Sequence, residues 1–199
     1  MTFPNAGPLD GAATSEHFRT EVSANTERFV NAVAESFRDA GFEISSATAD
    51  NDAVKVALRP RGDSVAAMAV IWDVPALDLK RLRACINASL RLHWQMLPKL
   101  PWWAREVDDT EGLRLAVVVS EAIDPQAKSW VYHHWLDDPG FPVIVDAATG
   151  EVVFRERPTF LGVLDWWIKR RLVRQVLVPA VAGLLAERQG SGVRKDLFG

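Results

Sequence analysis

The hydrophobic residues of this chain change their spacing early in the sequence, and that change restricts the fold class more than any other feature. Over residues 15–40 they recur every three or four positions, the period of a helix with one apolar face. Over residues 42–48 and 53–60 they alternate with polar residues, the period of a half-buried strand, and a third apolar run covers residues 65–74. The sequence therefore predicts an N-terminal helix followed by three strands.

The middle of the chain contains the same two kinds of pattern. Pro75 opens a second run with helical spacing over residues 76–97, and an apolar, β-branched stretch at residues 113–119 predicts a fourth strand. Two apolar runs around a Gly-containing loop, residues 141–145 and 151–154, predict a β-hairpin.

This order of elements predicts an α+β fold. We expect an N-terminal helix, an antiparallel sheet of roughly four to six strands with helices packed on one face, and a C-terminal apolar helical extension that is kinked or broken at Pro179. The order helix, three strands, helix, strand is similar to that of small chaperone-like α+β proteins, which dimerise and bind peptide segments of a partner. That resemblance implies a protein that works by binding other proteins.

The length of 199 residues favours one domain with an appendage. Residues 1–13 are rich in Pro and Gly and predict a flexible N-terminal arm, and residues 14–157 contain the predicted α+β domain. The C-terminal helical extension is expected over residues 158–190, and a polar tail over residues 191–199.

Composition and charge exclude some classes of function. The formal net charge is −3, whereas a dedicated nucleic-acid-binding protein usually presents a basic face, so no nucleic-acid partner is expected. Cys85 is the only cysteine, so no internal disulfide can form, and the first residues lack the basic start and apolar core of an export signal. We therefore expect a cytoplasmic protein.

One segment carries residues suited to acid–base or metal chemistry. If it is helical, His133 and Asp137 lie four residues apart on one face, and His134 and Asp138 do so on the next. A histidine and a carboxylate at this spacing can form an acid–base pair or part of a metal centre. A catalytic metal centre commonly has three protein ligands, and each face offers two. An enzyme with a site at these residues is therefore kept as an alternative. Because each face offers fewer ligands than a metal centre commonly has, no metal or cofactor is expected.

Tryptophan is unusually frequent, since the chain has eight tryptophans and one tyrosine. Two pairs are adjacent in the sequence, Trp102 with Trp103 and Trp166 with Trp167. Neighbouring residues on a helix or strand point in different directions, so one member of each pair is expected near the surface. Tryptophan is enriched at binding hot spots and membrane interfaces, although packing in a core is its more common use.

The C-terminal region contains eleven consecutive residues, Val176 to Ala186, without a charged or hydrogen-bonding side chain. This run is too short to cross a bilayer, which takes about 20 residues. A helix that is apolar on all sides must be covered by its own domain, by a second copy, by another protein or by lipid. Basic side chains before the run suit an anionic partner or anionic lipid. These basic residues are Lys169, Arg170, Arg171 and Arg174.

Together these features predict a non-enzymatic protein–protein interaction module, such as an adaptor, a chaperone-like protein or an assembly subunit. We expect it to dock a partner or a second copy of itself through the apolar C-terminal helix and an exposed loop that contains Trp102 and Trp103. The predicted contact residues are Trp102, Trp103, Trp166, Trp167, Leu172, Val176, Leu177, Val181, Leu184 and Leu185. The alternatives are the enzyme described above and a peripheral membrane protein held by its tryptophans and basic residues.

Overall fold

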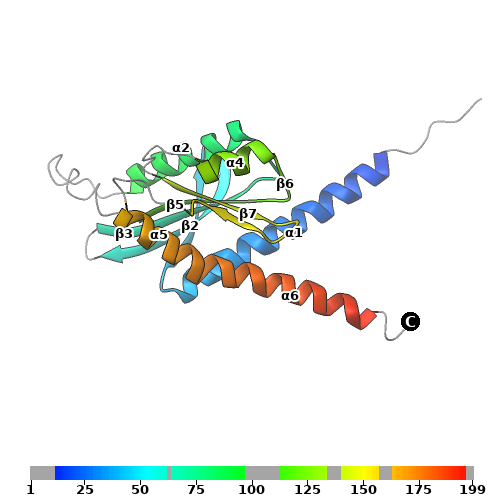
Figure 1. Ribbon diagram of the computed structural model, residues 1–199. Helices are drawn as coiled ribbons and strands as arrows, with labels where there is room; N and C mark the ends of the chain where they lie inside the picture. The colour runs from blue at the N-terminus through cyan, green and yellow to red at the C-terminus, as the bar shows by residue number, and fades with distance from the viewer. Residues whose placement is uncertain (1–11, 62–63, 97–112, 134–139, 157–162, 196–199) are drawn as a thin grey trace, which may run out of the picture.

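The computed structural model describes residues 12–61, 64–96, 113–133, 140–156 and 163–195 (Figure 1). The helical elements are α1 (Ala12–Asp39), α2 (Leu79–Met96), α4 (Pro125–His133), α5 (Val163–Leu172), the π-helical turn η1 (Val173–Leu177) and α6 (Val178–Lys195). The strands are β1 (Glu43–Ala49), β2 (Asp52–Arg61), β3 (Ser64–Asp73), β4 (Ala76–Leu77), β5 (Leu113–Ser120), β6 (Ala122–Ile123), β7 (Phe141–Asp146) and β8 (Val152–Phe154). The α+β class and the N-terminal and C-terminal helices are confirmed.

Six strands form one sheet in the order β1-β2-β3-β5-β7-β8, which is within the predicted range. The pairs β1–β2, β2–β3 and β7–β8 are antiparallel, but β3–β5 and β5–β7 are parallel. The sheet is therefore mixed, and the prediction of an antiparallel sheet is wrong for its centre. A parallel pair needs a long crossover connection, and α2 and α4 lie in the two crossovers.

Helices cover both faces of the sheet, whereas the sequence analysis placed them on one face (Figure 1). One core cluster joins α1 and the C-terminal helices to one face, through residues such as Phe37 and Leu177. A second cluster joins α2 and α4 to the opposite face, through residues such as Ile86 and Val131. The topology explains this arrangement, because β3, β5 and β7 follow one another across the sheet in one direction. Because both crossover connections have the same handedness, their helices lie on the same face of the sheet. The other face is covered by α1 and the C-terminal helices.

A two-stranded sheet extends the parallel arrangement beyond β3 and β5, because β4 pairs with β6 in parallel. An aspartate lies between each of these short strands and the helix that follows it. Asp78 Oδ1 accepts a hydrogen bond from the Arg81 backbone N–H at 2.6 Å, and Asp124 Oδ1 accepts one from the Gln126 backbone N–H at 2.8 Å. Both crossovers thus begin with the same kind of helix cap, which satisfies backbone donors at the helix start.

Candidate docking surface

Residues 163–195 form one continuous helical stretch of α5, η1 and α6, which we call the C-terminal arm. One stripe of this arm, its inward face, packs against α1 and the sheet. The side chains of the inward face are Val173, Val176, Leu177 and Val181, which are buried, and Leu172, Leu184 and Leu185, which are partly buried. Their spacing is that of one helix face, so the chain itself covers about half of the charge-free run.

The sequence predicts a kink or a break at Pro179. The arm stays helical through this residue, so it is not broken there. Proline has no N–H to donate, and its ring clashes with the carbonyl group four residues earlier in a regular α-helix. The chain widens into the π turn η1 directly before this point, and the Val178 backbone N–H donates to the Val173 carbonyl oxygen, five residues back. The distortion caused by Pro179 is thus taken up as a π turn within a continuous helix.

Two contacts fix the arm to the rest of the fold. Ser36 Oγ on α1 donates a hydrogen bond to the Val176 carbonyl oxygen at 2.6 Å, within the π turn. Further along, Leu185 lies against Gly150 in the turn between β7 and β8, where a Cβ atom would be only 2.1 Å from Leu185 Cδ1. Gly150 has a φ of +73°, a conformation that side chains with a Cβ rarely adopt. The arm is therefore held at both its middle and its C-terminal half.

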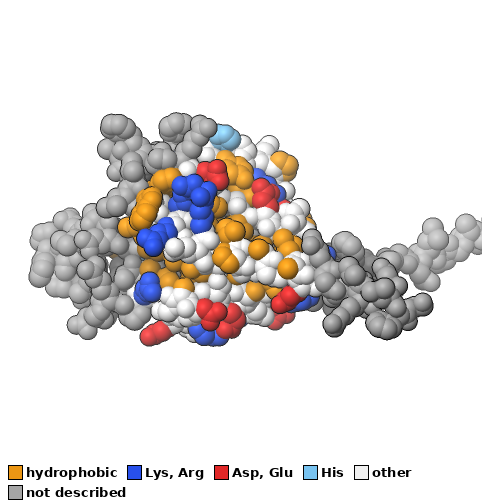
Figure 2. Space-filling view, turned by 60° about the horizontal axis from the view of Figure 1, so that its bottom comes forward, with side chains coloured by type: hydrophobic (Ala, Val, Ile, Leu, Met, Phe, Trp, Pro, Cys, Tyr) orange, Lys and Arg blue, Asp and Glu red, His pale blue; other side chains and the backbone are white. Residues whose placement is uncertain are grey.

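The opposite stripe of the arm, its outward face, exposes apolar side chains. Trp167, Ile168 and Val178 are 49%, 45% and 39% exposed, and they are three of the five large exposed hydrophobic residues in the described part of the chain. Smaller exposed residues continue the face along α6: Pro179, Ala182, Gly183 and Ala186. Figure 2 shows hydrophobic side chains across the middle of this side of the molecule, with Lys and Arg side chains gathered to the left.

The basic residues of the arm divide between the two faces. Lys169 is buried, with 6% of its surface exposed, so it does not belong to a surface patch. The guanidinium carbons of Arg170 and Arg171 lie 5.1 and 5.4 Å from the ring centres of Trp166 and Trp167, respectively. Such stacking holds an arginine over an indole while leaving its charge available.

Arg174 follows one turn later on the outward face. Its Nη2 lies 3.7 Å from Glu156 Oε1, with about half of each side chain exposed. An exposed pair of this kind contributes little to stability. The outward face therefore has indole and isoleucine at its start, two arginines next, and small apolar residues after them.

The predicted contact residues fall into three groups. Trp102 and Trp103 lie outside the described residues. Trp166 is half-buried and its Nε1–H donates to the Arg155 carbonyl oxygen at 3.1 Å, so it anchors the arm, whereas its neighbour Trp167 faces solvent. The remaining six are Leu172, Val176, Leu177, Val181, Leu184 and Leu185, which lie on the inward face and pack in the chain's own core.

The segment proposed for acid–base chemistry is described only at its start. His133 is the last residue of α4, is exposed, and donates through Nδ1 to the Ser129 carbonyl oxygen at 2.8 Å. His134, Asp137 and Asp138 lie outside the described residues. Among the residues that are described, no group of three or more His, Cys, Asp or Glu side chains is placed to hold a metal ion.

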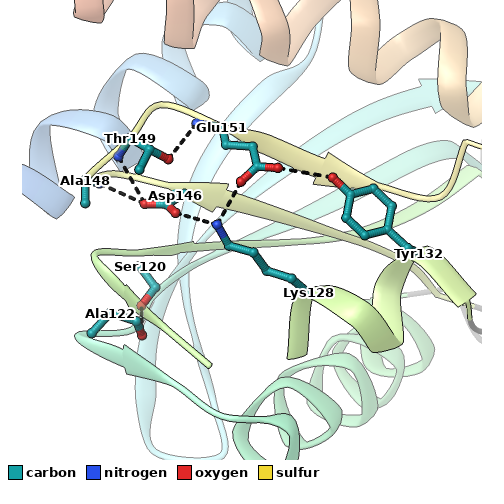
Figure 3. A network of polar contacts seen from close by, with 8 residues as sticks. All are labelled: Ser120, Ala122, Lys128, Tyr132, Asp146, Ala148, Thr149 and Glu151. Carbon is teal, nitrogen blue, oxygen red and sulfur yellow. Dashed lines mark hydrogen bonds and ion pairs between the residues drawn. The ribbon is translucent and has the colours of Figure 1, made fainter. Parts of the chain in front are cut away.

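A polar network that sequence analysis missed connects α4 to the β7–β8 hairpin (Figure 3). Lys128 Nζ donates to Asp146 Oδ2 and to Glu151 Oε2, both at 2.7 Å, and the Tyr132 hydroxyl donates to Glu151 Oε1 at 3.1 Å. Asp146 Oδ1 also accepts from the backbone N–H groups of the following turn. The only sequence signal was a lysine and a tyrosine four residues apart on one helix face.

The pKa values in this network favour its charged form. Burial alone would raise the pKa of Asp146, but the hydrogen bonds from Lys128 and from the turn lower it overall. Burial would lower the pKa of Lys128, but its two carboxylate partners raise it overall. Lys128 therefore stays protonated at neutral pH, which suits an ionic link and not a nucleophile or general base.

Two buried polar residues, His93 and Arg114, line a small cavity between α2 and the sheet. The cavity has room for about one water molecule. Beside it, Trp72 Nε1–H donates to Ser89 Oγ at 2.9 Å, and Ser89 Oγ donates to the Cys85 carbonyl oxygen at 2.8 Å. These contacts organise the second core cluster.

Comparison with protein-family models, curated proteins and solved structures found no match to this chain. In the described part of the chain, no helix has the length and apolar character needed to span a membrane.

Proposed function

We propose that this protein is a non-catalytic protein–protein interaction module that docks another protein chain on the outward face of the C-terminal arm. The observation that carries the proposal is the exposure of Trp167, Ile168 and Val178 on one helix face. Exposed apolar groups that cluster on one element mark interaction sites more often than single exposed residues do. Tryptophan and arginine are also the residue types that contribute most at binding hot spots.

The fold supports this role because the surface is formed before binding. The inward face fixes the helix in the core, and Ser36 and Gly150 hold it at two further points. A partner that binds a preformed helix does not have to order it, and this lowers the free-energy cost of association. An amphipathic helix presented in this way fits the mode in which one protein places a helix in the groove of another.

The alternatives receive less support from the contacts. Of the histidine segment the structure describes only His133, whose ring contacts Ser129 of its own helix. Of the four basic residues predicted to contact anionic lipid, Lys169 is buried, so such attachment would rest on Arg170, Arg171 and Arg174. The proposal includes a cytoplasmic location, because the single cysteine, Cys85, is buried and the chain has no second thiol to pair with it.

Site-specific photo-crosslinking in cells tests the proposal. A photoreactive phenylalanine analogue replaces Trp167 or Val178 on the outward face, and Trp94 on α2 in the matched control. Trp94 is 45% exposed, close to the 49% of Trp167, but its helix covers the opposite face of the sheet. We expect discrete crosslinked protein products from positions 167 and 178 and none from 94. Equal products from all three positions, or none from the outward face, would contradict the proposal.

A further inference from the structure

We infer that the occupant of the outward face is a second copy of this chain, with the two C-terminal arms crossing in antiparallel directions. This inference rests on the proposed function, and it specifies the partner. The shape and the charge of the outward face support it independently.

The shape of the face is complementary to itself. Val178 projects into solvent with 39% of its surface exposed, whereas a Cβ atom added at Gly183 would meet no other atom within 4 Å. Along the helix, Val178 and Gly183 lie equally far from the midpoint between Ala180 and Val181, on opposite sides of it. A twofold axis at that point places Val178 of each copy at the level of Gly183 in the other copy. The exposed residues Pro179 and Ala182 come to face each other in the same way.

Small residues at such a crossing allow two helices to approach closely. Each copy then contributes one protruding side chain and one open position, and the contact uses the same patch on both copies. A contact of this type closes on itself at two copies and forms no open chain.

The charges favour the antiparallel direction. No charged residue occurs between Arg174 and Glu187, and both of these residues are exposed. They also lie equally far from the proposed axis, so each Arg174 lies at the level of a Glu187 in the other copy. Parallel arms would instead bring Arg171 and Arg174 close to their own equivalents. Like charges placed together oppose association, and opposite charges favour it.

The contact is small for a protein interface. Specific, stable interfaces bury about 1,200–2,000 Å² in total, and one crossing of two helices buries less than that. We therefore expect a reversible dimer with a dissociation constant on the order of micromolar.

Sedimentation equilibrium of the full chain over a concentration series tests the inference. The mass is expected to rise from 22.1 kDa toward twice that value as concentration increases. Gly183→Gln fills the open position with a polar side chain and is expected to weaken dimerisation by about tenfold or more. The same change replaces a helical glycine in open space, so the melting temperature of the monomer should rise by about 1–3 °C. Loss of association then cannot be attributed to loss of folding.

A charge exchange tests the direction and the register. Arg174→Glu and Glu187→Arg are each expected to weaken dimerisation by about threefold to tenfold, and the double variant is expected to return to within about threefold of the wild type. Glu156→Gln removes the neighbour of Arg174 within the same chain and is the control, with no effect on dimerisation expected. Only contact between two copies allows one double variant to restore both pairs.

Three results would overturn the inference. The first is a chain that stays monomeric at all concentrations. The second is a dimer that does not respond to Gly183→Gln or to the charge exchange. The third is a monomer that binds vesicles of anionic lipid through the outward face. If the chain is monomeric but crosslinks another protein from positions 167 and 178, the proposed function stands without the second copy. If those crosslinks are also missing, both fail.

Discussion

Replacing Leu177 with alanine is expected to lower the free energy of unfolding by about 2.5–5 kcal/mol. Leu177 lies on the inward face of the C-terminal arm, where none of its surface is exposed, and it belongs to the core cluster shared by α1 and the sheet. The substitution removes three carbon atoms from this core while keeping a residue that favours helix. It therefore reports on packing and not on helix formation.

The magnitude follows from the burial of the side chain. Each methylene-sized group removed from the core contributes about 0.8 kcal/mol, so three contribute about 2.4 kcal/mol. The cavity left behind adds to this cost, because the surrounding side chains relax only in part. For a domain of this size, 1 kcal/mol corresponds to about 2–4 °C in melting temperature, so a decrease of about 5–20 °C is expected.

The neighbouring residue provides a matched control. Val178 is 39% exposed on the outward face, so Val178→Ala is expected to change the free energy of unfolding by less than about 0.5 kcal/mol. Urea unfolding followed by circular dichroism and by tryptophan fluorescence measures both variants. Two small effects would refute the placement of the arm in the core. Two large effects would refute the outward orientation of Val178.

Three further outcomes test other parts of the fold. Gly150→Ala is expected to lower the free energy of unfolding by about 1–3 kcal/mol, because alanine is strained at a φ of +73° and its Cβ displaces Leu185. An unchanged urea midpoint would contradict the contact between Gly150 and Leu185. Cys85 is expected to resist thiol reagents at pH 8 in the native protein, because burial raises the pKa of its thiol to about 11; rapid labelling without denaturant would contradict its burial. Asp146→Asn is expected to destabilise the protein at pH 7. The native pKa of Asp146 is lowered, so its contribution is present above its unfolded pKa of about 3.9 and is lost as pH falls through the native value. The difference in urea midpoint between wild type and variant should therefore shrink below about pH 4, and a constant difference would count against the ionic link to Lys128.

The individual helices and strands were predictable because their signals are local. Phe29, Val33 and Phe37 lie on one face at helical spacing, and all three are buried in the structure. The turn between β1 and β2 contains Asp50 and Asn51, which adopt φ values of +49° and +71°. Asn and Asp tolerate this left-handed conformation better than most residues.

The pairing of the strands was not predictable in the same way, because it depends on residues far apart in the sequence. One signal was nevertheless present in the composition of two strands. All eight residues of β5 and all six of β7 are buried. A continuous apolar strand is typical of a parallel sheet with helices on both faces, whereas a sheet covered on one face alternates between apolar and polar residues. These buried strands indicate a sheet with parallel strands at its centre. The order of the elements alone does not indicate this.

The two faces of the C-terminal arm were beyond sequence analysis for a different reason. A helix face is normally recognised by polar residues on its opposite side, and the run from Val176 to Ala186 contains none. The π turn adds a second difficulty, since it changes the angle between successive residues before α6 begins. If the outward face of α5 is continued into α6 at about 3.6 residues per turn, the expected face of α6 points in a different direction from the outward face in the structure.

Folding and docking are linked in the arm, and this determines which experiment is informative. Deletion of the arm would remove Val173, Val176, Leu177 and Val181 from the core, so loss of binding would follow from unfolding alone. A dimer that forms only from folded chains instead stabilises the fold as protein concentration rises.

In a homodimer the ligand is the chain itself, so at a total concentration about 100-fold above the dissociation constant about one chain in 15 is free. This corresponds to a stabilisation of about 1.6 kcal/mol, or about 3–6 °C in melting temperature. Gly183→Gln should abolish this concentration dependence while leaving the melting temperature at low concentration equal to or above that of the wild type, because the added side chain has no close neighbour within the monomer. Calorimetry of both proteins over a hundredfold range of concentration measures the effect. A wild-type melting temperature that does not change over this range would mean that the outward face contributes nothing to stability through a second copy.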